Sequence, residues 1–148
     1  MKLKRLQLDN NQFTGDITAA ISQLSAIELL YLNKNQLTGT IPHEIGLLTT
    51  LKFLKLSNNN ISGCVPDSVS NLTKLQLCVM SNNRIHGPAP RNLTTLTSLV
   101  DFHIFTSYPS LSLSTPRSFQ PDTFQRMYGW GPSIGIDSLH WPMDEESS

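Results

Sequence analysis

The sequence predicts an α/β solenoid, in which short strands and short helical turns alternate along coils that stack on one another. The first observation is a 24-residue pattern that occurs four times, over residues 3–26, 27–50, 51–74 and 75–98. The second is the period-two spacing of apolar residues at positions 4 and 6 of each copy, which indicates a short strand. The third is an apolar pair at positions 19 and 22, whose spacing favours a helical turn. One copy cannot bury its apolar side alone, so we expect the copies to share a continuous core.

The strand opens each copy, and its apolar side chains should point into the core. The residues at positions 4 and 6 are Leu6 and Leu8, Leu30 and Leu32, Leu54 and Leu56, and Cys78 and Met80. Identical strands one coil apart run in the same direction, so they should hydrogen-bond as a parallel sheet. Leu30, Leu54 and Leu56 should be shielded from water, because they belong to the two middle copies.

Asparagine occupies position 9 of every copy, directly after the strand. The four residues are Asn11, Asn35, Asn59 and Asn83. A side-chain amide has two N–H donors and one acceptor oxygen, and buried backbone groups need such partners. We therefore expect a structural ladder, in which each amide faces inward and bonds backbone groups of its own and the adjacent coil.

The second half of each copy carries the turn residues. Position 13 is Gly15, Gly39, Gly63 or Gly87, and position 16 is Pro42, Pro66 or Pro90 in all but the first copy. Glycine permits backbone angles that other residues resist, and proline lacks the N–H that strand pairing needs. We expect the chain to turn at the glycine, to end any pairing at the proline, and to continue into the helical turn on the back of the coil.

This pattern, L-x-x-L-x-L-x-x-N-x-L-x-G-x-I-P-x-x-L-x-x-L-x-x, resembles the plant-type leucine-rich-repeat family over about residues 3–98. The resemblance includes receptor-like and polygalacturonase-inhibiting-like repeats. It implies a right-handed superhelix with an inner parallel β-sheet and short helical turns on the convex side. Family members are mostly extracellular recognition modules, which implies a protein or peptide ligand and an extracellular or membrane-attached location.

The sequence departs from the family pattern at its two ends. The cysteine-paired caps, the membrane span and the kinase domain of receptor-like relatives do not occur in it. Met1 lies two residues before the first core leucine, so the first coil should present core side chains to water. We expect the chain to be a truncated gene model or a fragment of a longer receptor-like signalling protein.

A fifth copy begins at Leu99 but does not continue. Leu99, Phe102 and Ile104 fit positions 1, 4 and 6, whereas Ser107 replaces the asparagine and no Gly or Ile-Pro follows. We therefore divide the chain into a solenoid over 1–105, whose last part is a partial strand over 99–105, and a Ser/Thr/Pro-rich linker with an irregular tail over 106–148. The tail is either disordered or folded back over the last coil.

Charge and composition exclude several function classes. Lys plus Arg is 11 and Asp plus Glu is 11, so the net charge of zero argues against nucleic-acid and anionic-membrane binding. No apolar run approaches the roughly 18 residues of a membrane span, and the N-terminus has no apolar core of a signal peptide. Cys64 and Cys78 lie at different positions of the repeat, so a bridge between them is not expected, and their redox state stays open.

The strands should also carry the binding surface. Positions 3 and 5 are two residues apart, so their side chains share the face of the sheet that points away from the core. We call this surface the concave face. The residues that we expect to contact a ligand there are Arg5, Leu29, Tyr31, Phe53, Lys55, Leu77, Val79, Asp101 and His103. An exposed apolar cluster with a polar rim is typical of a contact site. Two alternatives stay open: the apolar residues are repeat drift without a ligand, or tail aromatics cover them.

The size of this face limits what it can bind. Five strands about 4.8 Å apart, each with exposed positions spanning about 17–20 Å, offer roughly 400 Å². A stable protein interface needs about 800 Å² per partner. We therefore expect this chain alone to bind a peptide, or to bind a protein weakly.

Other motifs carry weaker signals. Asn60, Asn71 and Asn92 begin N-x-[ST] sequons, which are possible glycosylation sites if the chain enters the secretory pathway. Asp101 and His103 share a strand face near Ser81, but serine recurs at the same position of the third copy, so we interpret it as a repeat feature rather than a catalytic triad. The histidines are scattered, so we expect no metal site, no cofactor and no catalytic residue.

The sequence thus predicts a non-catalytic recognition module that binds a protein or peptide along its concave face. Two alternatives remain: a run of structural spacer coils without its own ligand, and an inhibitor of a secreted cell-wall hydrolase, which the family resemblance allows. The oligomeric state and the identity of the ligand are open.

Overall fold

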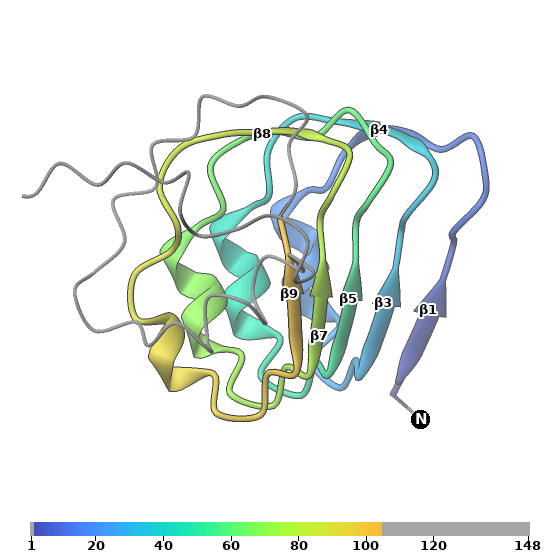
Figure 1. Ribbon diagram of the computed structural model, residues 1–148. Helices are drawn as coiled ribbons and strands as arrows, with labels where there is room; N and C mark the ends of the chain where they lie inside the picture. The colour runs from blue at the N-terminus through green and yellow to red at the C-terminus, as the bar shows by residue number, and fades with distance from the viewer. Residues whose placement is uncertain (1, 105–148) are drawn as a thin grey trace, which may run out of the picture.

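The computed structural model describes residues 2–104, which form one parallel sheet backed by a row of short helices (Figure 1). The sheet has five strands in the order β1 (Arg5–Gln7), β3 (Leu29–Tyr31), β5 (Phe53–Lys55), β7 (Leu77–Val79) and β9 (Asp101–His103). Each strand comes from a different coil and pairs with its neighbour in parallel, at a constant offset of one repeat. The predicted α/β solenoid with a parallel sheet is confirmed.

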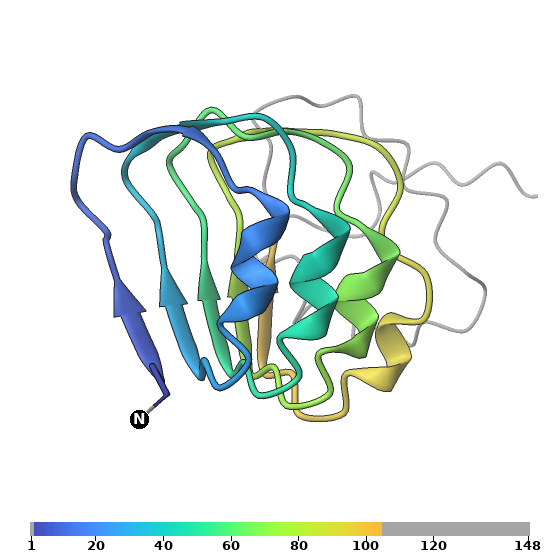
Figure 2. The same ribbon diagram turned by 180° about the vertical axis from the view of Figure 1, so that it is seen from behind.

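The helical turns are 3-10 helices on the side opposite the sheet, as the view from behind shows (Figure 2). They are η1 (Ala19–Gln23), η2 (His43–Leu47), η3 (Asp67–Asn71) and η4 (Leu93–Thr95). Pro42 and Pro66 stand just before η2 and η3 in an extended conformation, with φ −69° and ψ 144°. Proline suits this place because its φ is fixed and a helix leaves its first N–H groups unbonded.

The core lies between these two layers. Leu30, Leu54 and Leu56 have no solvent exposure, as expected for the middle coils. The first coil is less buried, because within the described residues only the second coil packs against it. Leu6 and Leu8 are half-buried there and help to line a cavity of about 280 Å³.

The position-9 asparagines bridge neighbouring coils. The Asn59 side-chain N–H groups donate to the Leu56 carbonyl of its own coil and to the Leu32 carbonyl of the preceding one, both at 3.0 Å. Its Oδ1 accepts the backbone N–H of Leu37, also at 3.0 Å. Asn83 and Asn35 repeat this arrangement one coil later and one coil earlier.

Asn11 does not make the contacts between coils that we expected of all four asparagines. Its side chain is exposed and donates only to the carbonyls of Leu8 and Asp9 in its own coil. Asn35 bonds the Leu8 carbonyl and the Phe13 N–H of the first coil. Within the described residues, no earlier coil offers such groups to Asn11.

Two small sheets near the glycines were not predicted. They pair β2 (Thr14–Asp16) with β4 (Gln36–Thr38), and β6 (Ser62–Gly63) with β8 (Arg84–Ile85), in parallel. From the sequence we assigned these residues to the turn at the glycine, so their pairing was not expected.

Several expectations concern the end of the chain and the cysteines. The partial fifth copy supplies β9, whereas the linker and tail over 106–148 lie outside the described residues.

Cys64 is exposed and Cys78 is buried, and both are free thiols. Burial raises the pKa of the Cys78 thiol. Among residues 2–104, no helix has the length and apolar character needed to cross a lipid bilayer.

Candidate functional site

The concave face consists of two rows of side chains that cross the five-stranded sheet. The strand register aligns position 3 as Arg5, Leu29, Phe53, Leu77 and Asp101, and position 5 as Gln7, Tyr31, Lys55, Val79 and His103. The structure therefore places all nine sequence-predicted contact residues in these two rows, together with Gln7. Each row therefore crosses the five strands that lie side by side in Figure 1.

Burial distinguishes this face from the core. In β3, β5 and β7 the middle residue is buried, whereas the residues on either side of it are half-buried. The alternation follows from strand geometry, in which successive side chains point to opposite faces. Leu29, Phe53 and Leu77 thus form the centre of one row, and Tyr31 and Val79 belong to the other.

The apolar residues of this face are less exposed than the sequence led us to expect. All five are half-buried, because side chains on strands about 4.8 Å apart cover one another. The described residues that do expose a large apolar side chain lie elsewhere: Leu3, Phe13, Leu47 and Val100. The concave face is therefore a packed apolar surface rather than a set of protruding side chains.

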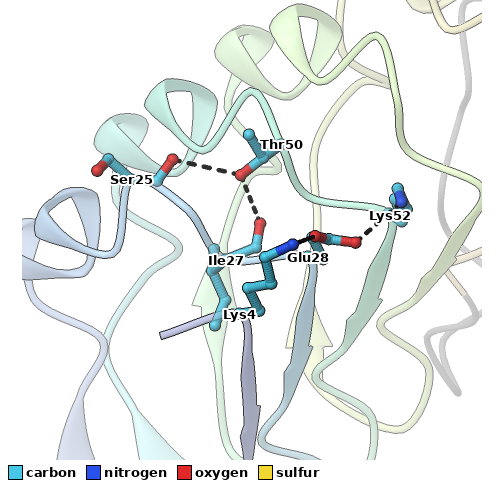
Figure 3. Close-up of polar contacts among 6 residues, drawn as sticks. All are labelled: Lys4, Ser25, Ile27, Glu28, Thr50 and Lys52. Carbon is cyan, nitrogen blue, oxygen red and sulfur yellow. Dashed lines mark hydrogen bonds and ion pairs between the residues drawn. The ribbon is translucent and has the colours of Figure 1, made fainter. Parts of the chain in front are cut away.

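A cluster of three charges lies beside the sheet at position 2 of the first three coils (Figure 3). Glu28 receives Lys4 Nζ at 3.0 Å on one carboxylate oxygen and Lys52 Nζ at 2.9 Å on the other. Hydrogen bonds from Lys52 and Lys4, and their positive charges, lower the pKa of Glu28 to about 2. One carboxylate thus links two ammonium groups across three coils, and the cluster keeps a net positive charge.

A third lysine lies on the concave face itself. Lys55 Nζ lies 4.6 Å from the centre of the Tyr31 ring, one strand away in the same row. An ammonium group at this distance is attracted by the negative face of an aromatic ring. The contact places a positive charge next to the apolar centre and fixes the Tyr31 ring.

The ends of the position-3 row carry opposite charges. Arg5 and Asp101 are both exposed, and neither forms an ion pair within residues 2–104. His103 is half-buried on the same strand as Asp101. Among the described residues, the face thus has a cation without an ion-pair partner at its β1 edge and a carboxylate without one at its β9 edge.

Sequence reasoning missed a row of residues with left-handed backbone at position 8. Asn10, Lys34, Asn58 and Asn82 have φ between 55° and 56°. The Asn82 side chain also donates from Nδ2 to Asn58 Oδ1 of the preceding coil, at 3.0 Å. The signal was present in the repeated Asn-Asn pair, because asparagine tolerates this conformation better than most residues.

The predicted glycosylation sites lie apart from the concave face. Asn60, Asn71 and Asn92 are all exposed. Asn71 ends η3 and Asn92 immediately precedes η4, so both belong to the helical layer. A glycan on either would leave the sheet accessible.

The concave face combines apolar and charged side chains. No group of three or more His, Cys, Asp or Glu side chains gathers closely enough within residues 2–104 to hold a metal ion. The face offers apolar area, an aromatic ring with an ammonium group over it, and two charges that have no ion-pair partner in the described part of the chain. Such features suit recognition of another molecule by shape and charge.

Comparisons with known proteins agree with this architecture. A family model described as "Leucine rich repeat" matches residues 1–61. Three solved structures illustrate the likeness, all from Arabidopsis thaliana. The ectodomain of the membrane receptor kinase GASSHO1/SCHENGEN3, in complex with CASPARIAN STRIP INTEGRITY FACTOR 2, is 32% identical with a TM-score of 0.67, over 70% of this chain and 12% of that one.

The other two are also receptor kinase ectodomains. That of HAESA, in complex with an IDA peptide hormone ligand, is 32% identical with a TM-score of 0.67, over 69% of this chain and 17% of that one. That of SOBIR1 is 33% identical with a TM-score of 0.62, and the match covers 66% of this chain and 52% of that one. The chain thus spans between about an eighth and about half of these structures. A search of the curated proteins found no match. The repeat pattern, the stacked coils and these likenesses together establish that the chain belongs to the leucine-rich-repeat family, in its plant-type class.

Proposed function

We propose that the chain is a non-catalytic recognition module that binds an extended peptide, or a protein segment, on its concave face. The observation that carries the proposal is the row of Leu29, Phe53 and Leu77, held in register on three paired strands and flanked by charges. Apolar surface with a polar rim is typical of contact sites. The rigid sheet keeps the face in one shape, so little ordering entropy is lost on binding.

The comparisons support the same role. HAESA and GASSHO1/SCHENGEN3 were solved with peptide or protein factors bound to their leucine-rich-repeat ectodomains. We extend this role to the present chain and propose that it belongs to a receptor-like signalling protein. With roughly 400 Å² on five strands, the face is suited to a peptide of a few residues.

The proposal can be tested by selection from a phage-displayed library of random 12-residue peptides. The immobilised full chain is expected to enrich binders, and Phe53→Glu and Tyr31→Ala are expected to weaken their capture at least about ten-fold, since buried aromatic residues dominate contact energies. The matched control is Leu47→Glu, because Leu47 is an exposed apolar residue of η2, 61% accessible, on the opposite layer. It should leave capture unchanged.

Two outcomes would contradict the proposal. Capture that survives both concave-face substitutions, or that falls equally with Leu47→Glu, would assign these coils a spacer role. Circular dichroism melting of each variant would establish that the substitutions leave folding intact, because Tyr31 and Phe53 are only half-buried.

We also propose an extracellular location, supported by the ectodomain origin of the similar structures and by the exposure of Asn60, Asn71 and Asn92. Expression behind a secretory leader in plant cells should add N-glycans that peptide N-glycosidase removes. Replacing the three asparagines by glutamine should abolish the mass difference. Secreted protein without any glycan would contradict the use of these sites.

A further inference from the structure

One row of the concave face carries opposite charges at its two ends. The register runs Arg5, Leu29, Phe53, Leu77 and Asp101 across all five strands. Four strand spacings of about 4.8 Å put Arg5 and Asp101 about 19 Å apart. The row therefore begins with a cation, continues with three apolar residues and ends with a carboxylate.

The two end charges differ from the other charges near them. Lys4 and Lys52 are both bound to Glu28, and Lys55 lies over the Tyr31 ring. At the other end, no basic side chain of residues 2–104 forms an ion pair with Asp101. At the β1 end, the nearby Asp9 carboxylate accepts a hydrogen bond from Asn10. Arg5 and Asp101 are the charged residues of this row itself and lie at its two ends, whereas Lys55 keeps its positive charge in the neighbouring row.

A ligand that complements this row has defined dimensions. An extended peptide advances about 3.3 Å per residue, so about six residues cover the distance from Arg5 to Asp101. Alternate side chains of such a peptide point to one face, so the two end residues and about two residues between them would face the sheet. The side chains between the two ends would lie over the apolar stretch of Leu29, Phe53 and Leu77.

We propose that the concave face binds an extended peptide in one orientation, with an acidic group over Arg5, a basic group about six residues away over Asp101, and apolar side chains between them. This rests on the proposed function and adds the chemistry and the polarity of its ligand. Complementary charges at the rim of an interface fix the register of the partner more than they add affinity. The apolar row supplies the contact area, and the end charges select the direction.

Three synthetic peptides with the same alternating apolar centre test the charge pattern. One has Asp at one end and Lys at the other, one has Asp at both ends, and one has Lys at both ends, all with capped termini. In nuclear magnetic resonance titrations of the full chain at low salt, the mixed peptide is expected to bind up to about five-fold more tightly than the other two. This preference should shrink at 0.5 M NaCl, because salt screens exposed charges.

Charge reversal at each end of the row should change the preference predictably. Arg5→Glu is expected to favour the peptide with two Lys residues, and Asp101→Lys the peptide with two Asp residues. The control is Arg84→Glu, which makes the same charge change at an exposed residue of β8, outside the five-stranded sheet. It should keep the preference of the unaltered chain.

The orientation itself is measured with a nitroxide attached to the mixed peptide. A label at the acidic end should broaden the amide signals of β1 and leave those of β9 sharp, and a label at the basic end should do the opposite. Binding that Phe53→Glu abolishes but that shows no charge preference, or equal broadening at both edges, would overturn this inference and leave the proposed function intact.

Two further outcomes have separate meanings. Failure of all three peptides to bind the unaltered chain would overturn the inference and count against the proposed function as well. Sedimentation can show whether the chain binds a second copy of itself. If the molecular mass rises with protein concentration, and if Phe53→Glu restores the mass of the monomer, the ligand of the face is a second copy of the chain and the peptide assignment is overturned.

Discussion

Gly46 of η2 packs directly against Ser68 of η3, at a place where the two helices leave no room for a side chain. A Cβ on Gly46 would overlap the Ser68 carbonyl oxygen and would lie 2.6 Å from the Ser68 Cβ. The same serine donates its hydroxyl to the His43 carbonyl at 2.6 Å, which ties the helical layers of two coils together. The close approach of successive coils on the helical side thus depends on a residue without a side chain.

Gly46→Ala is therefore expected to destabilise the chain by about 1–3 kcal/mol, because a methyl group forced into a packed contact shifts the backbone. Urea unfolding followed by circular dichroism measures the effect. Leu47→Ala is the control, since Leu47 is exposed on the same helix and its change should stay within about 0.5 kcal/mol. Equal midpoints for Gly46→Ala and the unaltered chain would contradict the packing seen between η2 and η3.

The asparagine ladder predicts a large difference between two chemically identical substitutions. Asn59→Ala leaves the Leu37 N–H without its side-chain acceptor, and Asn59 is buried, whereas the Leu32 and Leu56 carbonyls still accept from Asn35 and Asn83. An unsatisfied buried group costs about 1–3 kcal/mol, so a loss in this range is expected. Asn11→Ala should cost about 1 kcal/mol or less, because Asn11 is exposed and bonds only its own coil. Similar unfolding midpoints for the two variants would refute a bridging role.

Glu28 predicts a dependence of stability on pH. Its pKa is lowered from 4.5 to about 2 by Lys52 and Lys4, so the unfolded chain takes up this proton at a higher pH than the folded chain does. The contribution of Glu28 is then fully present above about pH 4.5 and is lost as the pH falls through about 2. Glu28→Gln should flatten the fall of the unfolding free energy over this window.

Two comparisons check the assignment to Glu28. Lys52→Met should flatten the same curve in part, because Lys4 still contacts the carboxylate. High salt should also flatten the curve of the unaltered chain, since Lys4 is mostly exposed and the pair with it is screened. A Glu28→Gln variant with an unchanged slope between pH 4.5 and 2 would rule out this source of acid sensitivity.

Lys34 predicts a stabilising substitution. It has φ 55°, in the left-handed region, at the position where the other three copies carry asparagine. Asparagine tolerates this region better than lysine does, so Lys34→Asn is expected to raise the free energy of unfolding by up to about 1 kcal/mol. The reverse change, Asn58→Lys, should lower it by a similar amount. Thermal melting of both variants measures these changes. A lower melting temperature for Lys34→Asn than for the unaltered chain would argue against strain at this position.

The repeat made most of the fold predictable. Leu30 and Leu54 recur at one position of the pattern, and only a stack of coils buries them both, so the parallel sheet and the shared core follow from spacing alone. The placement of Phe53 and Tyr31 on the opposite face follows from strand alternation. Asn59 was predictable as a bridge because its chemistry requires backbone partners where the strand ends.

Other features were out of reach of the pattern. The pairing of β6 with β8 involves two residues on each strand, which is too few to leave a periodic signal. The pairing of Lys55 with Tyr31 depends on which strand lies beside which and on the direction of two side chains. The partial burial of Phe53 arises from side chains on neighbouring strands, which lie a full repeat away in the sequence.

The sequence by itself determined that this chain is a solenoid and which residues face its core, because a strict 24-residue repeat forces equivalent side chains into equivalent places. Only the tertiary structure decided how the charges are distributed. Glu28 is neutralised by lysines from the coils on both sides, whereas Arg5 and Asp101 stay exposed at opposite edges of the sheet. The reason is distance: electrostatic pairing depends on a few ångströms in space, and residues that are one repeat apart in the chain become neighbours only when the coils stack.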